Sequence, residues 1–183
     1  MNPGEIISTQ QLHNLEVSFW YPMESDAEPL CEYINTLSKE RTYIQLQGEQ
    51  VSLEDEKKYL DNLLKKIKDG TGGSIVAWAD GQIVGYLDLR PKEKATRHVI
   101  NFGITVRKEY RGKGIGKQLI LLAIQQIRLN FKHHKIMTLS AHADNELAIA
   151  LYRKLGFVQY GQLPDGVFRE GQYHDLILMY KKL

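Results

Sequence analysis

The amino-acid sequence predicts a mixed α/β fold in which a central, mostly antiparallel sheet of about seven strands is flanked by about four helices. Strand-like and helix-like hydrophobic patterns alternate along the chain, and a glycine-rich segment stands between a predicted strand and a predicted helix. No internal repeat or low-complexity linker divides the sequence. The 183 residues are therefore expected to form one domain over residues 1–183.

The composition, with 43% hydrophobic and 25% charged residues, is typical of a globular protein. The net charge of +2 is too small for a general affinity for nucleic acid or for an anionic membrane. A single cysteine, Cys31, excludes an internal disulfide and a thiolate metal cluster and favours a reducing cytoplasm. Residues 1–11 contain no long apolar run, so neither a signal peptide nor a membrane span is expected there. The sequence leaves a homodimer possible.

The first predicted elements are one strand and two helices. Apolar and polar residues alternate over residues 15–20, as in a half-buried strand, and Pro22 ends this pattern. Residues 26–39 carry apolar side chains at helical spacing. A second amphipathic helix is expected to begin at Ser52, whose hydroxyl can cap the first turn, and to end at Gly70.

The middle of the chain predicts an antiparallel meander. Two β-rich runs at residues 75–79 and 83–89 flank the pair Asp80-Gly81, and an Asp-Gly pair between such runs is a strong hairpin signal. A further strand over residues 98–106 completes the meander.

The remainder alternates between helical and strand periodicity. Asp144 or Asn145 can cap its last helix, and Gly156 supplies the left-handed residue that commonly ends one. The predicted elements are a helix over residues 114–130, a strand over 136–141, a helix over 144–155, and strands over 157–160 and 173–180.

A glycine-rich turn joins the strand 98–106 to the next helix. Such a turn leaves backbone N–H groups free at the positive end of a helix dipole, which suits phosphate oxygens. The turn itself reads Arg111-Gly112-Lys113-Gly114-Ile115-Gly116, and its neighbourhood holds the cations Arg107, Lys108, Arg111, Lys113 and Lys117 against the single acid Glu109. The sequence therefore predicts a local anion site.

Two common phosphate loops do not match this turn. A Walker A loop requires Ser or Thr after the Gly-Lys pair, but Gly116-Lys117 is followed by Gln118. A dinucleotide fingerprint requires its third glycine one residue later than Gly116, after a parallel βαβ pattern that is absent here.

The pattern R/Q-x-x-G-x-G/A of the GNAT superfamily matches residues 111–116. A second block at residues 145–157, which reads N-E-L-A-I-A-L-Y-R-K-L-G-F, resembles the family's segment N-x-x-A-x-x-x-Y-x-x-x-G-F. The chain therefore resembles the GNAT superfamily of acetyl-CoA-dependent N-acetyltransferases, and the order of its elements agrees over about residues 15–182.

This resemblance implies an acyltransferase in which acetyl-CoA and a primary amine bind together and the acetyl group passes directly between them. The strand before the loop and the strand after its helix are expected to splay apart, with the pantetheine arm between them. No metal ion is expected. The residues that the resemblance assigns to the cofactor are Ile104, Thr105, Val106, Arg111, Gly112, Lys113, Gly114, Ile115, Gly116, Lys117, Asn145, Ala148 and Tyr152.

The resemblance also assigns catalytic roles. Tyr152 aligns with a family tyrosine near the CoA sulfur and is taken as the general acid, because a phenol with a pKa of about 10 can protonate a thiolate. Asn145, Ala148 and Tyr152 share one helix face. Many relatives carry a glutamate on the strand before the loop, whereas this strand has no carboxylate. The tentative general base is Asp88, and the alternatives are His98, Glu170, His174 and Asp175.

The resemblance also implies that the acceptor binds between the segment 41–52, which joins the first two helices, and the loop 163–173, which precedes the last strand. These segments hold Tyr43, Gln45, Gln47, Glu49, Asp165, Glu170 and Tyr173. Small amines, amino acids and protein N-termini are all compatible with the family. A non-catalytic acyl-CoA sensor or scaffold is the alternative, and the missing strand carboxylate favours it. A nucleic-acid-binding domain that uses residues 107–117 and His133-His134 is disfavoured, because the chain lacks an aromatic platform and an overall basic face.

Overall fold

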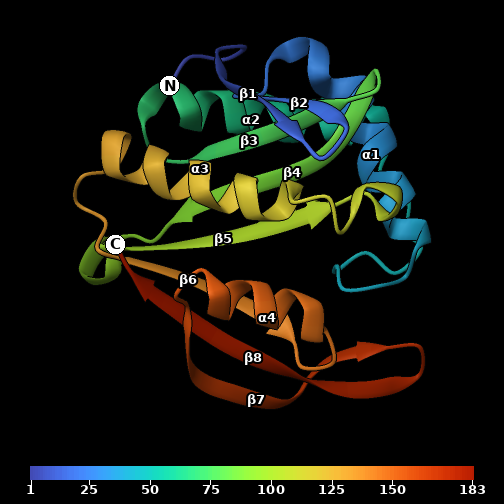
Figure 1. Cartoon of the computed structure of the whole chain (residues 1–183), viewed down its shortest axis with the longest axis vertical. Helices are drawn as coiled ribbons and strands as arrows, with labels where there is room; N and C mark the ends of the chain where they lie inside the picture. The colour runs from blue at the N-terminus through green and yellow to red at the C-terminus, as the bar shows by residue number, and fades with distance from the viewer.

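The computed structural model describes residues 1–183 and contains four α-helices around one eight-stranded sheet (Figure 1). The strands are β1 (Ile6–Leu12), β2 (Leu15–Trp20), β3 (Gly73–Ala79), β4 (Gln82–Pro91), β5 (Val99–Val106), β6 (Ile136–His142), β7 (Val158–Arg169) and β8 (Gln172–Lys182). The helices are α1 (Ala27–Lys39), α2 (Leu53–Asp69), α3 (Ile115–Asn130) and α4 (Glu146–Lys154).

The strand order across the sheet is β1-β2-β3-β4-β5-β6-β8-β7. Every neighbouring pair is antiparallel except β5 and β6, which are parallel and are connected through α3. The predicted mixed, mostly antiparallel α/β fold is confirmed. No helix combines the length and the apolar character that a membrane span requires.

The expected number of strands was wrong by one, because the sequence pattern missed β1. This edge strand contains Gln and Thr rather than an apolar alternation, and it pairs with β2 through a tight turn at His13, whose φ is 55°. Its cross-strand contacts include a 3.0 Å hydrogen bond between the hydroxyls of Thr9 and Ser18. Strand formation here depends on pairing with β2 and not on burial.

The last hairpin also differs from its prediction. Residues 163–173 were expected to form a loop, but most of them extend β7 and β8, and the connection is a tight turn at Glu170 and Gly171. β7 is largely exposed, so it has little hydrophobic alternation to reveal it.

Most of the other predicted ends are close to the observed ones. The Ser52 hydroxyl accepts from the Asp55 amide at 3.1 Å and begins α2, while Gly70 ends it with a φ of 67°. Asn145, rather than Asp144, caps α4 through its side chain. The Asp80-Gly81 pair forms the turn between β3 and β4.

The two faces of the sheet carry separate cores. α3 and α4 cover a large core that includes Ile75, Leu87 and Phe102, whereas α1 and α2 pack over β3 and β4 around Val76 and Ile83. Where α3 crosses β4, a Cβ on Gly85 would lie 3.0 Å from the Leu119 side chain. Glycine at this position therefore lets the helix lie close to the sheet and fixes the start of α3 beside the end of β5.

Candidate active site

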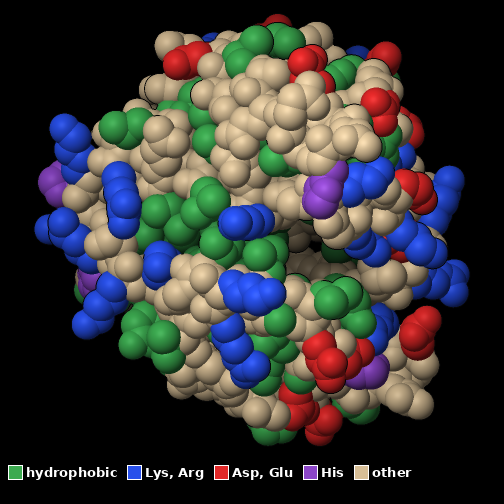
Figure 2. Space-filling view, in the orientation of Figure 1, with side chains coloured by type: hydrophobic (Ala, Val, Ile, Leu, Met, Phe, Trp, Pro, Cys, Tyr) green, Lys and Arg blue, Asp and Glu red, His purple; other side chains and the backbone are tan.

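Strands β5 and β6 lie side by side only where they begin. Parallel pairing joins residues 99–101 to residues 136–138 and then stops. Beyond this point β5 continues along β4 and β6 continues along β8. The sheet opens between β5 and β6, as the resemblance implies, and the space-filling view is hollowed over this region (Figure 2). Ile104, Thr105 and Val106 line the open edge of β5 and are half-buried.

The glycine-rich loop lies at the open end of this gap. The backbone N–H groups of residues 112–117 donate to no other backbone group in the protein. Gly112 and Gly114 have φ angles of 77° and 86°, which glycine adopts without strain. The loop thus presents a row of free donors at the N-terminus of α3, and these donors fit the pyrophosphate of a coenzyme A ester.

Gly116 serves a different purpose from the other two glycines. It lies inside the first turn of α3, and its φ is not in the left-handed region. A Cβ at this position would lie 3.6 Å from Val106 and 3.8 Å from Leu151, which is ordinary contact. The backbone therefore does not require glycine here. A ligand that approaches the first turn of α3 would require it, because a larger side chain would occupy the same space.

Two arginines of the cationic stretch fix the loop in place. Arg107 is buried and its Nη2 lies 3.3 Å from the Glu32 carboxylate of α1. Arg111 donates through Nε to the Val106 carbonyl at 2.9 Å and pairs with Glu40, which follows α1. Their charges are thus partly neutralised. The lysines of the stretch that make no ion pair are Lys108, Lys113 and Lys117.

Helix α4 forms the opposite wall of the gap. The Asn145 side chain accepts from the Ala148 amide at 3.2 Å and fixes the first turn. Two turns further on, Tyr152 is only 7% exposed, and its ring packs edge-on against Phe102 and Phe157. Its hydroxyl makes no hydrogen bond within the protein, and burial raises the pKa of Tyr152 to about 12. The phenol is therefore a protonated donor at neutral pH.

Asp88 lies on the other side of β5 from Tyr152. It stands opposite Gly103 in the β4–β5 register and accepts from the Gly103 amide at 3.1 Å. Arg90 Nε lies 2.8 Å from its second oxygen. Burial raises the pKa of the Asp88 carboxyl, while the Arg90 guanidinium and the Gly103 amide oppose this shift. The Tyr152 ring packs on Phe102, and the Asp88 carboxylate is bonded to the next residue, Gly103. The two groups therefore flank the same part of β5.

The other base candidates lie elsewhere. His98 precedes β5 at its paired end, and Glu170 forms the turn between β7 and β8. Asp175 accepts two hydrogen bonds from β7, which lower the pKa of its carboxyl. His174 Nδ1 lies 3.7 Å from the Asp144 carboxylate. Asp88 is thus the candidate that lies directly against the open part of β5.

The segment between α1 and α2 is held by its own polar side chains. Gln47 Nε2 donates to the Thr42 carbonyl at 3.1 Å, and the Ser38 hydroxyl donates to the Glu49 carbonyl at 2.6 Å. Backbone hydrogen bonds also lower the pKa of the Glu49 carboxyl. Gln47 and Glu49 therefore shape the segment.

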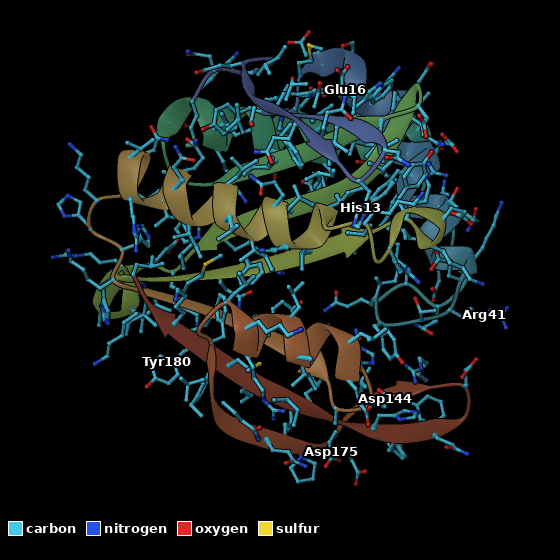
Figure 3. All side chains as sticks on the ribbon, in the orientation of Figure 1. His13, Glu16, Arg41, Asp144, Asp175 and Tyr180 are labelled. Carbon is cyan, nitrogen blue, oxygen red and sulfur yellow. The ribbon has the colours of Figure 1, made fainter.

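A cluster around the buried Arg169, which the sequence did not predict, ties this segment to the end of β6 and to the last hairpin. Arg169 is 8% exposed, its Nη2 donates to the Asp144 carboxylate at 2.5 Å, and its guanidinium lies 4.8 Å from the ring centre of Tyr43. Tyr43 also packs edge-on against His142. Figure 3 places Asp144 between the segment that bears Arg41 and the last hairpin. No local pattern could reveal this cluster, because Arg169 is 25 residues and Tyr43 is 101 residues from Asp144 in the sequence.

Tyr173, Asp165 and Glu170 lie on the last hairpin and make no hydrogen bond, ion pair or aromatic contact with this cluster. Tyr173 is 67% exposed and packs on Phe168, with ring centres 5.0 Å apart. The Asp165 amide donates to Asp175, which keeps Asp165 in the β7 bulge. Of the seven residues expected at the acceptor site, Tyr43 is the one that the structure places in the cluster around Arg169.

A family model described as "Acetyltransferase (GNAT) family" matches residues 11–157. An L-methionine sulfoximine/L-methionine sulfone acetyltransferase of Pseudomonas paraeruginosa is 34% identical over 112 residues, which are 60% of this chain and 63% of that protein. An L-amino acid N-acetyltransferase of Escherichia coli is 31% identical over 106 residues, covering 57% of this chain and 65% of that protein. The matched part thus spans less than two thirds of these relatives.

Solved structures agree over more of the chain. A ribosomal-protein-alanine N-acetyltransferase of Brucella melitensis has a TM-score of 0.79 at 28% identity, with 90% of this chain and 99% of that chain covered. A GNAT acetyltransferase of Streptococcus pneumoniae has a TM-score of 0.82 at 24% identity, with 91% and 99% covered, and supports the fold. The family match over residues 11–157 shows that the chain belongs to the GNAT family of acetyltransferases.

Proposed function

We propose that this protein is an N-acetyltransferase that moves the acetyl group of acetyl-CoA directly to a primary amine. The observation that carries the proposal is the gap between β5 and β6, which has free amide donors at residues 112–117 and, on the helix that walls it, Tyr152 with an unpaired hydroxyl. Each feature corresponds to one part of the co-substrate. The amides suit its pyrophosphate and the phenol suits its sulfur.

Binding of acetyl-CoA would use the loop, β5 and α4 together. The amides of residues 112–117 would donate to the pyrophosphate, and the lysines of the loop would add positive charge. The β5 backbone groups at Ile104, Thr105 and Val106 that have no β6 partner would hydrogen-bond the pantetheine arm. Ala148 and the cap residue Asn145 bring the first turn of α4 to the gap. Arg111 would act by holding the loop through its contacts with Glu40 and Val106.

The reaction requires one proton to leave the amine and one to reach the sulfur. Acetyl-CoA supplies the electrophilic thioester carbon, to which the amine nitrogen bonds as the carbon–sulfur bond breaks. Tyr152 would donate its proton to the departing thiolate, and Asp88 would accept the proton that the amine loses. Tyr152 packs on Phe102, and Asp88 accepts from the amide of Gly103. The acid and the base therefore lie on opposite sides of β5. Proton exchange with water then restores both groups.

A non-catalytic acyl-CoA sensor would be favoured if no carboxylate stood near this strand. β5 has none of its own, but the Asp88 Oδ1 atom lies 2.7 Å from the point that a Cβ on Gly103 would occupy. The neighbouring strand β4 thereby supplies a carboxylate next to β5, which supports the enzyme and not the sensor. The single half-buried cysteine, Cys31, is consistent with the cytoplasm, where we place the enzyme, and we propose no nucleic-acid partner.

The proposal is tested first by thermal unfolding with and without acetyl-CoA. Ligand at about 100 times its Kd adds about 2.7 kcal/mol to the free energy of unfolding. For a chain of this size the expected rise in Tm is roughly 5 to 10 °C. ATP or NAD at the same concentration should produce no rise, because neither has a pantetheine arm to fill the gap between β5 and β6. An equal rise with ATP would contradict a coenzyme A site.

Gly116→Val is expected to abolish this rise in Tm, because its branched side chain fills the approach to the first turn of α3. The Gly116 backbone needs no positive φ, so the variant should still fold with a Tm near that of the parent. Gly116→Ala is the matched control: its Cβ makes only ordinary contacts, and the rise with acetyl-CoA should remain. Full acetyl-CoA binding by Gly116→Val would place the pyrophosphate elsewhere.

A further inference from the structure

Two side chains of opposite charge converge over Gly103 on the open part of β5. A Cβ at this position would lie 2.7 Å from Asp88 Oδ1 and 2.8 Å from Arg90 Nη2, so any other residue would displace both groups. Both side chains come from β4, where residues 88 and 90 point to the same face of the sheet. Glycine therefore allows a carboxylate and a guanidinium to meet directly above β5.

The contact between these two side chains leaves one edge of the guanidinium free. Arg90 uses Nε for Asp88, and its Nη1 and Nη2 atoms make no hydrogen bond within the protein. The Arg90 side chain is 58% exposed, while that of Asp88 is 21% exposed. Asp88 is thus held between Arg90 and the Gly103 amide, whereas the two terminal nitrogens of Arg90 have no hydrogen-bond partner. Such a pair of donors matches the two oxygens of a carboxylate.

Asp88 is the one ion-pair partner of Arg90 within the protein. The Tyr86 hydroxyl, on the same face of β4, is already occupied by Ser74 at 2.8 Å and by Tyr59 at 3.0 Å. Asp144, in the turn between β6 and α4, is paired with Arg169. Arg90 therefore has its two terminal nitrogens available beside a carboxylate that stands against the reacting part of β5.

An α-amino acid carries an amine and a carboxylate on one carbon. Because Arg90 Nε lies 2.8 Å from the Asp88 carboxylate, a guanidinium and a carboxylate stand side by side and match the two ends of such a head group. The four charges would then alternate in sign, which favours binding of the zwitterion. Neither a peptide N-terminus nor a polyamine has a carboxylate on the carbon that carries its amine.

We propose that the acceptor is a free α-amino acid whose carboxylate is bound by Arg90 while its amine lies against Asp88. This inference rests on the proposed acetyl transfer and names the acceptor class for it. Arg90 would be a specificity-determining residue, since it touches the acceptor but takes no part in the proton transfers. It is also distinct from the residues that would hold acetyl-CoA.

The test compares each of the common L-amino acids with its primary amide, which keeps the amine but has no carboxylate, in an assay of CoA release. The best amino acid should be acetylated with a kcat/KM about tenfold to a hundredfold above that of its amide, as expected for a charged hydrogen-bonded contact. Arg90→Gln should raise the KM for the amino acid by a similar factor and leave the KM for the amide and for acetyl-CoA nearly unchanged. Arg90→Lys should restore part of the preference.

Arg128→Gln, on the exposed surface of α3, is the matched control and should keep the preference of the parent. If Arg90 only held Asp88 in place, Arg90→Gln would lower kcat for the amino acid and for the amide by the same factor, and the inference would fail. Equal acetylation of amides, peptide N-termini or spermidine by the parent would also overturn it and leave acetyl transfer standing. Acetyl-CoA binding without CoA release for any amine would instead refute the proposed function itself.

Discussion

Replacing Tyr152 by phenylalanine is expected to lower kcat for acetyl transfer by about 10²- to 10⁴-fold, the range that general acid catalysis contributes. The variant keeps the ring that packs against Phe102 and Phe157 and loses only a hydroxyl that has no partner in the protein. Folding and acetyl-CoA affinity should therefore change little. Steady-state CoA release and the rise in Tm with acetyl-CoA measure the two effects separately.

The pH dependence of the parent enzyme follows from the same environment. Burial raises the pKa of Tyr152 to about 12, so the phenol should stay protonated across the range in which the protein is assayed.

Tyr160→Phe is the matched control for Tyr152→Phe, because Tyr160 is an exposed tyrosine on β7 that packs on Tyr180. An unchanged kcat in Tyr152→Phe, or an equal loss of kcat and acetyl-CoA affinity, would contradict the role of general acid.

The sequence predicted those parts of the fold that bury one face or carry a cap. α2 shows both signals, since Leu60, Leu63 and Ile67 form its buried stripe between the caps Ser52 and Gly70. β1 and most of β7 show neither, because an edge strand can be stabilised by backbone pairing on one side alone. Hydrophobic periodicity reflects burial, so it does not reveal edge strands whose side chains are largely exposed.

A similar division applies to the candidate site. The glycine loop and Tyr152 belong to continuous motifs, so their residues could be named from the sequence. The pairing of Asp88 with Gly103 depends on the register between β4 and β5, and that of Arg169 with Asp144 on how the last hairpin folds back onto β6. Register and hairpin docking are set by the whole sheet. The sequence could therefore offer Asp88 only as one base candidate among five.

Replacing Asp88 by asparagine is expected to lower kcat by about 10²-fold or more, because the amide cannot accept the amine's proton at neutral pH. The asparagine oxygen can still accept from the Gly103 amide, so β4 and β5 should remain paired. The substitution leaves Gly116 and α4 untouched, and acetyl-CoA should still raise the Tm. Asp69→Asn, at the exposed end of α2, is the matched control.

The pH profile separates a base from a merely structural carboxylate. A base must be deprotonated, so kcat of the parent should fall as the pH decreases through the pKa of Asp88, which burial raises above the usual aspartate value against the opposing effect of Arg90. In Asp88→Asn this acidic limb should disappear, and the residual rate should depend only on the ionisation of the amine. A variant that kept the acidic limb together with near-normal kcat would move the base to another group, with His174 beside Asp144 as the next candidate. If Asp88→Asn lost kcat but kept the acidic limb at the same pH as in the parent, Asp88 would position the acceptor or Arg90, and water would accept the proton.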